Sequence, residues 1–181
     1  MYNLKYQGVF DIPEGDGSCV ITLTDMKEQR SFAVLAERPV AMELKNHGNQ
    51  LVDTSHQLVD VLCRLIGERW EDYFVRLEGM RDRGFKAMLC NGADGSEMPI
   101  RPDEAVLLSR IAKIDICASL ETFQKYSMPF DRNVATVALP ILALPDSLLE
   151  KALEKAVNEE NYESASFIRD EINRRKKAAT R

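Results

Sequence analysis

The sequence lacks the long hydrophobic segments that mark a membrane protein. No run of eighteen apolar residues occurs, so we expect no transmembrane helix and no membrane partner. The first residues, Met1 to Tyr6, do not form the apolar centre of a secretory signal. We therefore predict a cytoplasmic protein.

Cysteine and histidine are also scarce. The four cysteines, Cys19, Cys63, Cys90 and Cys117, form no CxxC pair, and only two histidines accompany them. Zinc sites and disulfide frameworks usually show closer and more regular spacing. The expected state of these cysteines is therefore a reduced, buried thiol.

The chain has no excess of basic residues. Its formal net charge is −5, and residues 141 to 181 hold equal numbers of acidic and basic side chains, so the deficit lies in residues 1 to 140. Nucleic-acid binding draws much of its affinity from basic residues that neutralise phosphates. The bulk composition therefore does not predict a basic face. Neither a Gly-rich phosphate loop nor an HExxH motif is present.

Residues 1–130 show the same order of predicted elements twice. Alternating apolar residues predict three strands over 4–10, 19–24 and 31–35, then a helix over 39–46, and three further strands over 73–77, 85–89 and up to 100, then a helix over 102–112. In both halves an Arg-Pro pair, Arg38-Pro39 and Arg101-Pro102, opens the helix. The pattern predicts an α+β domain, duplicated βββα in type, with a mostly antiparallel sheet.

Three further elements are expected around this repeat. A helix over 55–66 places Leu58, Val59, Leu62 and Ile66 on one face, with Thr54 and Gln57 at capping-box spacing. A short strand over 114–118 and a helix over 120–126 follow the second βββα unit.

The end of the chain is expected to be entirely helical. A connector punctuated by prolines, residues 131–145, leads to a helical hairpin over residues 146–177, whose second helix begins after Asn161. Two short helices bury little apolar surface against each other. The hairpin is therefore expected to pack on the main domain, on its own copy, or on the hairpin of another protein.

The stretch Leu148 to Ile172 resembles the UVR motif, the UvrB/UvrC interaction hairpin. The resemblance rests on Asn161-Tyr162-Glu163, Ala165 and Ile168-Arg169-Asp170-Glu171-Ile172. It implies a protein-interaction module that pairs with a similar hairpin. The candidate partner-binding residues are Leu153, Tyr162, Ile168, Arg169 and Ile172. Arg169 and Asp170 also fit a simple ion pair on the helix surface.

Residues 1–130 resemble the bifunctional nuclease family. The stretches that carry the resemblance are 38–43, 55–58, 77–85 and 101–108, although the segments at 35–41 and 55–58 depart from the family pattern. The resemblance implies a bacterial α+β domain that hydrolyses DNA and RNA and that a UVR hairpin often follows.

Phosphodiester hydrolysis needs an activated water and positive charge near the phosphate. The candidate catalytic residues are Glu43, His56, Arg101, Asp103 and Glu104. Asp60, one helical turn after His56, would orient that histidine. Glu43, Asp103 and Glu104 would hold Mg²⁺ or Mn²⁺.

The same residues also have structural explanations. His56 fits a surface position near a helix start, and Asp103 and Glu104 fit acidic residues that stabilise a helix N-terminus. Arginines such as Arg101 often pair with such acidic residues.

Two functions remain open on sequence grounds. The first is a nuclease acting on DNA or RNA, recruited to its partner by the hairpin. The second is a non-enzymatic adaptor, in which the α+β domain binds a protein or small ligand and the hairpin drives assembly. In both cases we expect a homo-oligomer or a complex with another UVR-like hairpin.

Overall fold

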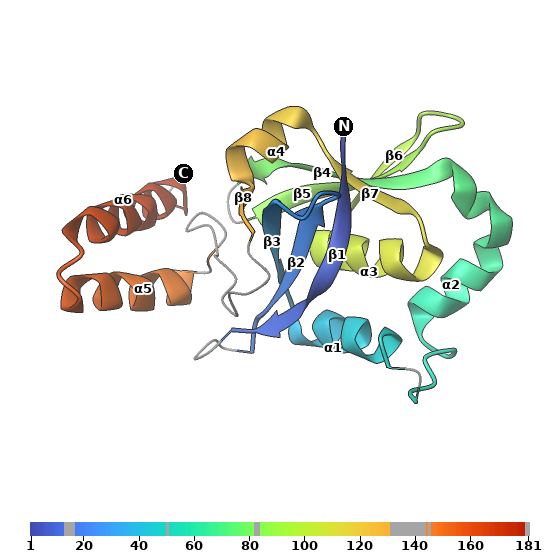
Figure 1. Ribbon diagram of the computed structural model, residues 1–181, viewed down its shortest axis with the longest axis horizontal. Helices are drawn as coiled ribbons and strands as arrows, with labels where there is room; N and C mark the ends of the chain where they lie inside the picture. Colours follow the sequence, from blue (N-terminus) through green and yellow to red (C-terminus); the bar gives the residue numbers. More distant parts are fainter. Residues whose placement is uncertain (13–16, 50, 82–83, 131–143, 145, 180–181) are drawn as a thin grey trace.

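A computed structural model describes residues 1–12, 17–49, 51–81, 84–130, 144 and 146–179 of the 181-residue chain (Figure 1). The predicted connector at 131–145 lies outside these residues except for Leu144. The rest of the chain forms an α+β domain and a C-terminal helical hairpin, as the sequence predicted.

The α+β domain is built on one eight-stranded sheet. Its strand order is β6-β5-β4-β7-β1-β2-β3-β8. All neighbouring strands pair antiparallel except β4 and β7, which are parallel. The strands are β1 (Tyr2–Asp11), β2 (Cys19–Asp25), β3 (Arg30–Ala36), β4 (Tyr73–Arg81), β5 (Gly84–Asn91), β6 (Glu97–Ile100), β7 (Asp115–Ala118) and β8 (Met128–Pro129).

The two predicted βββα units are present as two meanders. Strands β1 to β3 precede α1 (Arg38–His47), and strands β4 to β6 precede α3 (Pro102–Ala112). Each helix has its proline in the first turn, where the missing N–H removes no hydrogen bond. Strand β7 lies between the meanders and joins them into one sheet.

The main hydrophobic core lies between the sheet and the helices α1 and α3, which cover one face (Figure 1). Alternation along the strands explains this, since Val75 and Leu77 point into the core while Arg76 points to the opposite face. Helix α3 is the central helix, with six buried residues. Helix α4 (Leu120–Tyr126) contributes Phe123, which packs edge-on against Phe32.

Helix α2 (Leu58–Ile66) is shorter than predicted. The sequence placed its start at Ser55 with a capping box, but Gln57 is the N-cap residue and makes no side-chain cap hydrogen bond. Its predicted apolar face is also divided, because Val59 and Ile66 pack against the core whereas Leu58 and Leu62 are exposed. A 3-10 helix, η1 (Gly67–Asp72), connects α2 to β4.

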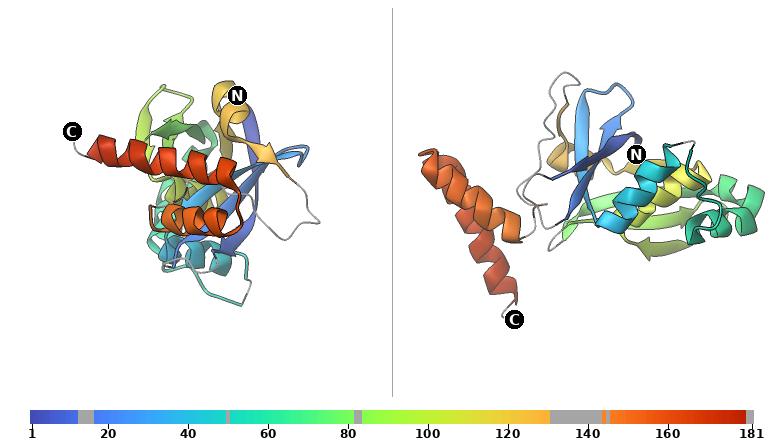
Figure 2. Two further views of the ribbon diagram at one scale, coloured as in Figure 1. Left: turned by 90° about the vertical axis from the view of Figure 1, so that its left-hand side faces the viewer. Right: turned by 90° about the horizontal axis from the view of Figure 1, so that it is seen from below.

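The C-terminal hairpin consists of α5 (Asp146–Asn158) and α6 (Tyr162–Ala179). Figures 1 and 2 show it set beside the α+β domain. It has a small hydrophobic cluster of its own, in which Leu149, Ala156, Ala165 and Ile168 are buried. The predicted cap is confirmed, since the Asn161 side chain accepts a hydrogen bond from the Ser164 N–H at 3.2 Å.

In the part of the chain that the structure describes, no helix is long and apolar enough to cross a membrane. All four cysteines are free. Cys19, Cys90 and Cys117 are buried, as expected, whereas Cys63 is only partly buried.

Candidate functional site

Three of the predicted catalytic residues lie together where the two βββα units meet. Arg101, the N-cap residue of α3, places Nη1 2.9 Å from Glu37 Oε1 and Nη2 3.0 Å from Glu104 Oε1. Its Nε lies 3.7 Å from Oδ1 of Asp103. We call these four residues the helix-start cluster. Because Glu37 precedes α1, the cluster joins the N-termini of two helices.

Asp103 has a structural role in this cluster. Its side chain is buried, and its Oδ2 accepts a hydrogen bond from the Glu37 N–H at 3.2 Å. Its Oδ1 accepts from the Glu104 N–H at 2.9 Å. One carboxylate therefore satisfies backbone donors at the starts of both α1 and α3, where a negative charge also opposes the positive end of the helix dipole.

The other two predicted catalytic residues lie elsewhere. Glu43 is half-buried in the middle of α1. His56 is exposed in the turn before α2, not in its first helical turn, because the helix begins only at Leu58. The structure therefore brings Arg101, Asp103 and Glu104 together, and it does not pair His56 with Asp60.

The histidine beside Asp60 is His47, the last residue of α1. Its Nε2 lies 3.0 Å from Asp60 Oδ2, and its Nδ1 lies 3.3 Å from the hydroxyl of Thr54. The side chains of His47 and Asp60 are 17% and 18% exposed. The imidazole of His47 therefore contacts the carboxylate of Asp60 through one ring nitrogen and the hydroxyl of Thr54 through the other.

Thr54 and Asp60 line a cleft of about 530 Å³, and His47 contacts both of them from behind this lining. Asp60, Cys63 and Arg64 from α2 line it together with Thr54, Trp70 and Ile111. Arg64 is exposed and supplies positive charge at this position. His56 follows Ser55, one of the residues that line this cleft. The pKa of Asp53, another lining residue, is lowered mainly by hydrogen bonds from Ser55 and to a lesser extent by His56.

Three polar atoms at this site are buried without a hydrogen bond from another described residue. They are His47 Nε2, Asp60 Oδ2 and Gln57 Oε1. The contact between His47 and Asp60 is thus a close ion-pair contact whose angles do not meet those of a directed hydrogen bond. Buried polar atoms without partners cost free energy, and they concentrate where a ligand or water supplies the missing contact.

We call His47, Asp60 and Thr54 the histidine site. The sequence predicted that Asp60 pairs with His56, and it indicated no role for His47. Both His47 and His56 precede Asp60 in the sequence, so the sequence alone does not show which of them lies beside Asp60. The choice between them depends on how the segment before α2 folds.

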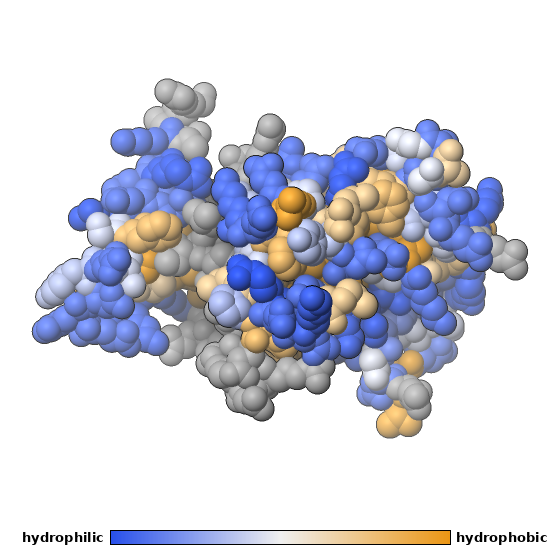
Figure 3. Space-filling model, turned by 45° about the horizontal axis from the view of Figure 1, so that its top comes forward, coloured by the Kyte–Doolittle hydropathy of each residue, from blue (hydrophilic) through white to orange (hydrophobic). Residues whose placement is uncertain are grey.

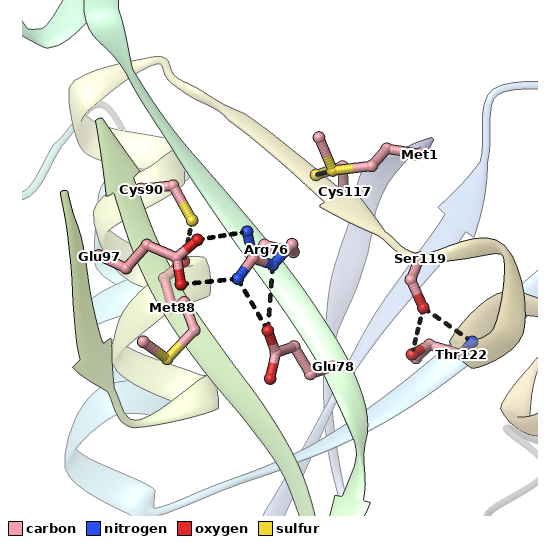
Figure 4. Close-up of polar contacts among 9 residues, drawn as sticks. All are labelled: Met1, Arg76, Glu78, Met88, Cys90, Glu97, Cys117, Ser119 and Thr122. Atoms are coloured by element: carbon pink, nitrogen blue, oxygen red, sulfur yellow. Dashed lines mark hydrogen bonds and ion pairs between the residues drawn. The ribbon is translucent and has the colours of Figure 1, made fainter. Parts of the chain in front are cut away.

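A second polar group lies on the sheet face opposite the core (Figure 4). The Arg76 guanidinium binds both oxygens of Glu97, at 2.8 and 2.9 Å, and also donates to Glu78. The carboxylate of Glu97, and secondarily that of Glu78, raises the pKa of Arg76 above its usual value. Two carboxylates around one guanidinium leave a net negative charge, so this group does not attract phosphate.

This second group borders a smaller pocket of about 240 Å³, which also includes Thr122. Thr122 donates its N–H to the Ser119 hydroxyl, the cap of α4.

Figure 3 shows apolar side chains among the hydrophilic ones on the side of the molecule that bears the N-terminus.

Of the residues expected to bind a partner through the hairpin, Tyr162 and Arg169 are exposed, and Ile168 is buried inside the hairpin. Leu153 and Ile172 are partly buried against the same small cluster. Arg169 lies 3.4 Å from Asp170, as the ion-pair alternative proposed. The exposed apolar side chains of the hairpin are Val157, Tyr162 and Phe167.

Comparison with protein families identifies the hairpin. Residues 147–178 match the UVR family, described as the UvrB/uvrC motif. The comparisons provide no evidence for the bifunctional nuclease domain expected over residues 1–130, and no curated protein matches the chain. The C-terminal hairpin of this protein is therefore a UvrB/uvrC motif, an interaction module attached to an α+β domain.

Proposed function

We propose that the α+β domain hydrolyses phosphodiester bonds in DNA or RNA at the histidine site, and that the UVR hairpin recruits it to a partner. The proposal rests on the contacts of His47 with Asp60 and with Thr54, two residues that line a cleft together with Arg64. A base, a group that orients it and a positive charge are the parts that this reaction needs.

The chemistry follows from the order of the three side chains. The mechanism requires the proton of neutral His47 on Nε2. The 3.0 Å contact with Asp60 then aligns into a hydrogen bond when substrate binds, and Nδ1 accepts a proton. The Thr54 hydroxyl both donates and accepts hydrogen bonds, so it relays a proton from an attacking water to His47. The water oxygen forms a bond to phosphorus, and the P–O bond to the leaving group breaks. His47 then returns the proton to the leaving-group oxygen. Arg64 stabilises the charge that develops on the phosphate.

The acidic residues expected to hold Mg²⁺ or Mn²⁺ do not fit such a site in this structure. Asp103 binds two backbone N–H groups, and Glu104 is paired with Arg101. Across the described part of the chain, no group of three or more His, Cys, Asp or Glu side chains is arranged to hold a metal. The proposed mechanism therefore uses only His47, Asp60, Thr54 and Arg64, and metal dependence stays a prediction for the assay.

For the hairpin, we propose that its exposed apolar side chains form the contact with a second UVR-like hairpin. Val157, Tyr162 and Phe167 are 51%, 70% and 57% exposed. Aromatic residues contribute much of the free energy of protein interfaces.

The adaptor hypothesis is the second candidate, and the helix-start cluster favours it. Its carboxylates and Arg101 are engaged with one another and with backbone N–H groups, which leaves three of the predicted catalytic residues, Arg101, Asp103 and Glu104, in structural roles. In that case the α+β domain binds a ligand without turnover.

The deciding experiment measures cleavage of labelled single-stranded DNA and RNA by the purified full chain, with Mg²⁺, with Mn²⁺ and with EDTA. His47→Gln and Asp60→Asn are expected to reduce the rate by about 10²- to 10⁴-fold, the usual contribution of a general base. His56→Gln is the matched variant and is expected to keep the wild-type rate.

Three outcomes would contradict the proposal. Equal rates in His47→Gln and wild type would exclude the histidine site. Loss of activity only in His56→Gln or Glu104→Gln would favour the catalytic residues predicted from the sequence. A wild-type chain without any cleavage would favour the adaptor.

A further inference from the structure

Helix α2 carries an apolar face that nothing in the described structure covers. Leu58, Val61, Leu62 and Leu65 are 82%, 37%, 41% and 74% exposed. They follow the spacing i, i+3, i+4, i+7, which in a globular protein normally marks the buried side of a helix. None of the nine residues of α2 is fully buried, although Val59, Cys63 and Ile66 pack against the core from the other side.

The uncovered face runs along about two turns of α2. Leu51 and Val52, just before α2 in the chain, are a further 93% and 38% exposed. Figure 1 shows α2 at the outer edge of the α+β domain, on the side away from the hairpin.

We propose that this face binds a second copy of the chain, with the two α2 helices packed antiparallel around a twofold axis. An axis between Val61 and Leu62 places Leu58 opposite the partner's Leu65, and Val61 opposite the partner's Leu62. The exposure has the same symmetry, since the two outer leucines are 82% and 74% exposed and the two central residues 37% and 41%. A twofold interface requires this kind of self-complementary surface.

The charges around the face favour a second copy over a membrane or a charged partner. Asp60 and Arg64 are the only charged residues of α2, so the helix has no net charge and two copies do not repel each other there. A helix that binds anionic lipid usually has several basic residues beside its apolar face, and α2 has one. Antiparallel packing also brings opposite ends of the two helix dipoles together.

This dimer differs from any association through the hairpin, because α2 belongs to the α+β domain. It does not depend on the proposed hydrolysis. The clefts, which Asp60, Cys63 and Arg64 of α2 help to line, would lie on both sides of the α2 contact, so that one dimer presents two histidine sites.

The test is the mass of the full chain in solution, measured by sedimentation equilibrium at micromolar concentration. Wild type is expected at twice the monomer mass of 20.5 kDa. Leu65→Glu is expected to raise the dimer dissociation constant at least about 100-fold, because a charge in an apolar contact loses its hydration. Leu58→Lys should have the same effect. The double variant should regain the dimer, since the two introduced side chains carry opposite charges and face each other across the twofold axis.

Matched variants distinguish this surface from the others. Met26→Glu changes a residue that is 67% exposed outside α2, and it should leave the dimer intact. Phe167→Glu changes the exposed face of the hairpin and should also leave it intact. Since Leu65 is exposed in the single chain, Leu65→Glu should keep the wild-type circular dichroism spectrum, while its melting temperature falls with the loss of the dimer. The double variant tests the pairing even if one single variant folds poorly.

A monomeric wild type, or a dimer that persists in Leu65→Glu, would overturn the proposal. A dimer lost only in Phe167→Glu would assign association to the hairpin instead. Flotation of a monomeric chain with phosphatidylserine-containing vesicles, abolished by Leu65→Glu, would overturn the proposal in favour of a membrane.

Discussion

A buried ion pair lies at the end of the hairpin where α6 ends beside the start of α5. Glu171 and Arg175, whose side chains are 5% and 6% exposed, lie one turn apart on α6 with Oε1 and Nε at 2.8 Å. Arg175 Nη1 also donates to the Leu144 carbonyl at 2.7 Å and to Asp146 at 2.9 Å. This arrangement ties the end of α6 to the start of α5.

Glu171→Gln removes the charge and keeps the shape of the side chain. Removing one partner of a buried pair costs about 3–5 kcal/mol, because the remaining charge is left without compensation. Asp146 still binds Arg175, so we expect the lower end, about 3 kcal/mol. The hairpin buries only four apolar side chains fully, so this loss is large relative to the stability of so small a unit.

The same pair predicts a dependence on pH. Hydrogen bonds from Arg174, and then from Arg175, lower the pKa of Glu171 despite its burial. A carboxyl group with a lowered pKa stabilises the folded state above the usual glutamate pKa, and this contribution is lost as the pH falls through the lowered value. The wild-type hairpin should therefore open more readily in acid, and Glu171→Gln should reduce that dependence.

Hydrogen exchange followed by mass spectrometry on the full chain measures the effect. Peptides from α5 and α6 should exchange faster in Glu171→Gln, while peptides from the α+β domain should not change. Glu163→Gln, at an exposed position in the first turn of α6, is the control. Equal protection of the hairpin in both variants would refute the reasoning.

Three further predictions address the α+β domain. Asp103→Asn should lower the free energy of unfolding by about 1–3 kcal/mol in urea denaturation, because backbone donors lose a charged acceptor. Glu104→Gln, at an exposed position, should change the free energy of unfolding by less than about 0.5 kcal/mol. Equal effects of the two variants would contradict the capping role of Asp103. Iodoacetamide should modify the partly exposed Cys63 before the buried Cys117. The rate of modification should still rise at pH 9, because burial raises the pKa of both thiols. Modification of Cys117 before Cys63 would contradict the described burial. Hydrogen bonding to Arg76 lowers the pKa of Glu97, so Glu97→Gln should make the free energy of unfolding less sensitive to acid; an unchanged pH dependence would contradict this contact.

Local patterns predicted most of the fold. The alternation in β1 to β6 and the prolines before α1 and α3 specify the two meanders and their helices, because these signals act within a few residues. The hairpin was predictable for the same reason, down to the cap at Asn161. The position of β7 between the meanders was not, since strand order depends on contacts between distant segments.

The candidate site was predicted less well. The sequence suggested that Asp60 pairs with a histidine, but it selected His56 because the helix was expected to begin at Ser55. Once α2 begins at Leu58, His56 is left in an exposed turn and the preceding segment brings His47 to Asp60. Periodicity likewise predicted that Leu58 and Leu62 belong to an apolar face, but it does not state whether that face lies inside the domain or between two chains.

The most direct test of the histidine site uses the fact that the chain has only two histidines. With ¹⁵N-labelled histidine, the NMR spectrum of the full chain contains two ring systems, and His56→Gln assigns them. The account predicts that neutral His47 carries its proton on Nε2 and that its signals shift when a single-stranded oligonucleotide is added. A proton on Nδ1, or His47 signals that do not respond to the oligonucleotide, would contradict the account.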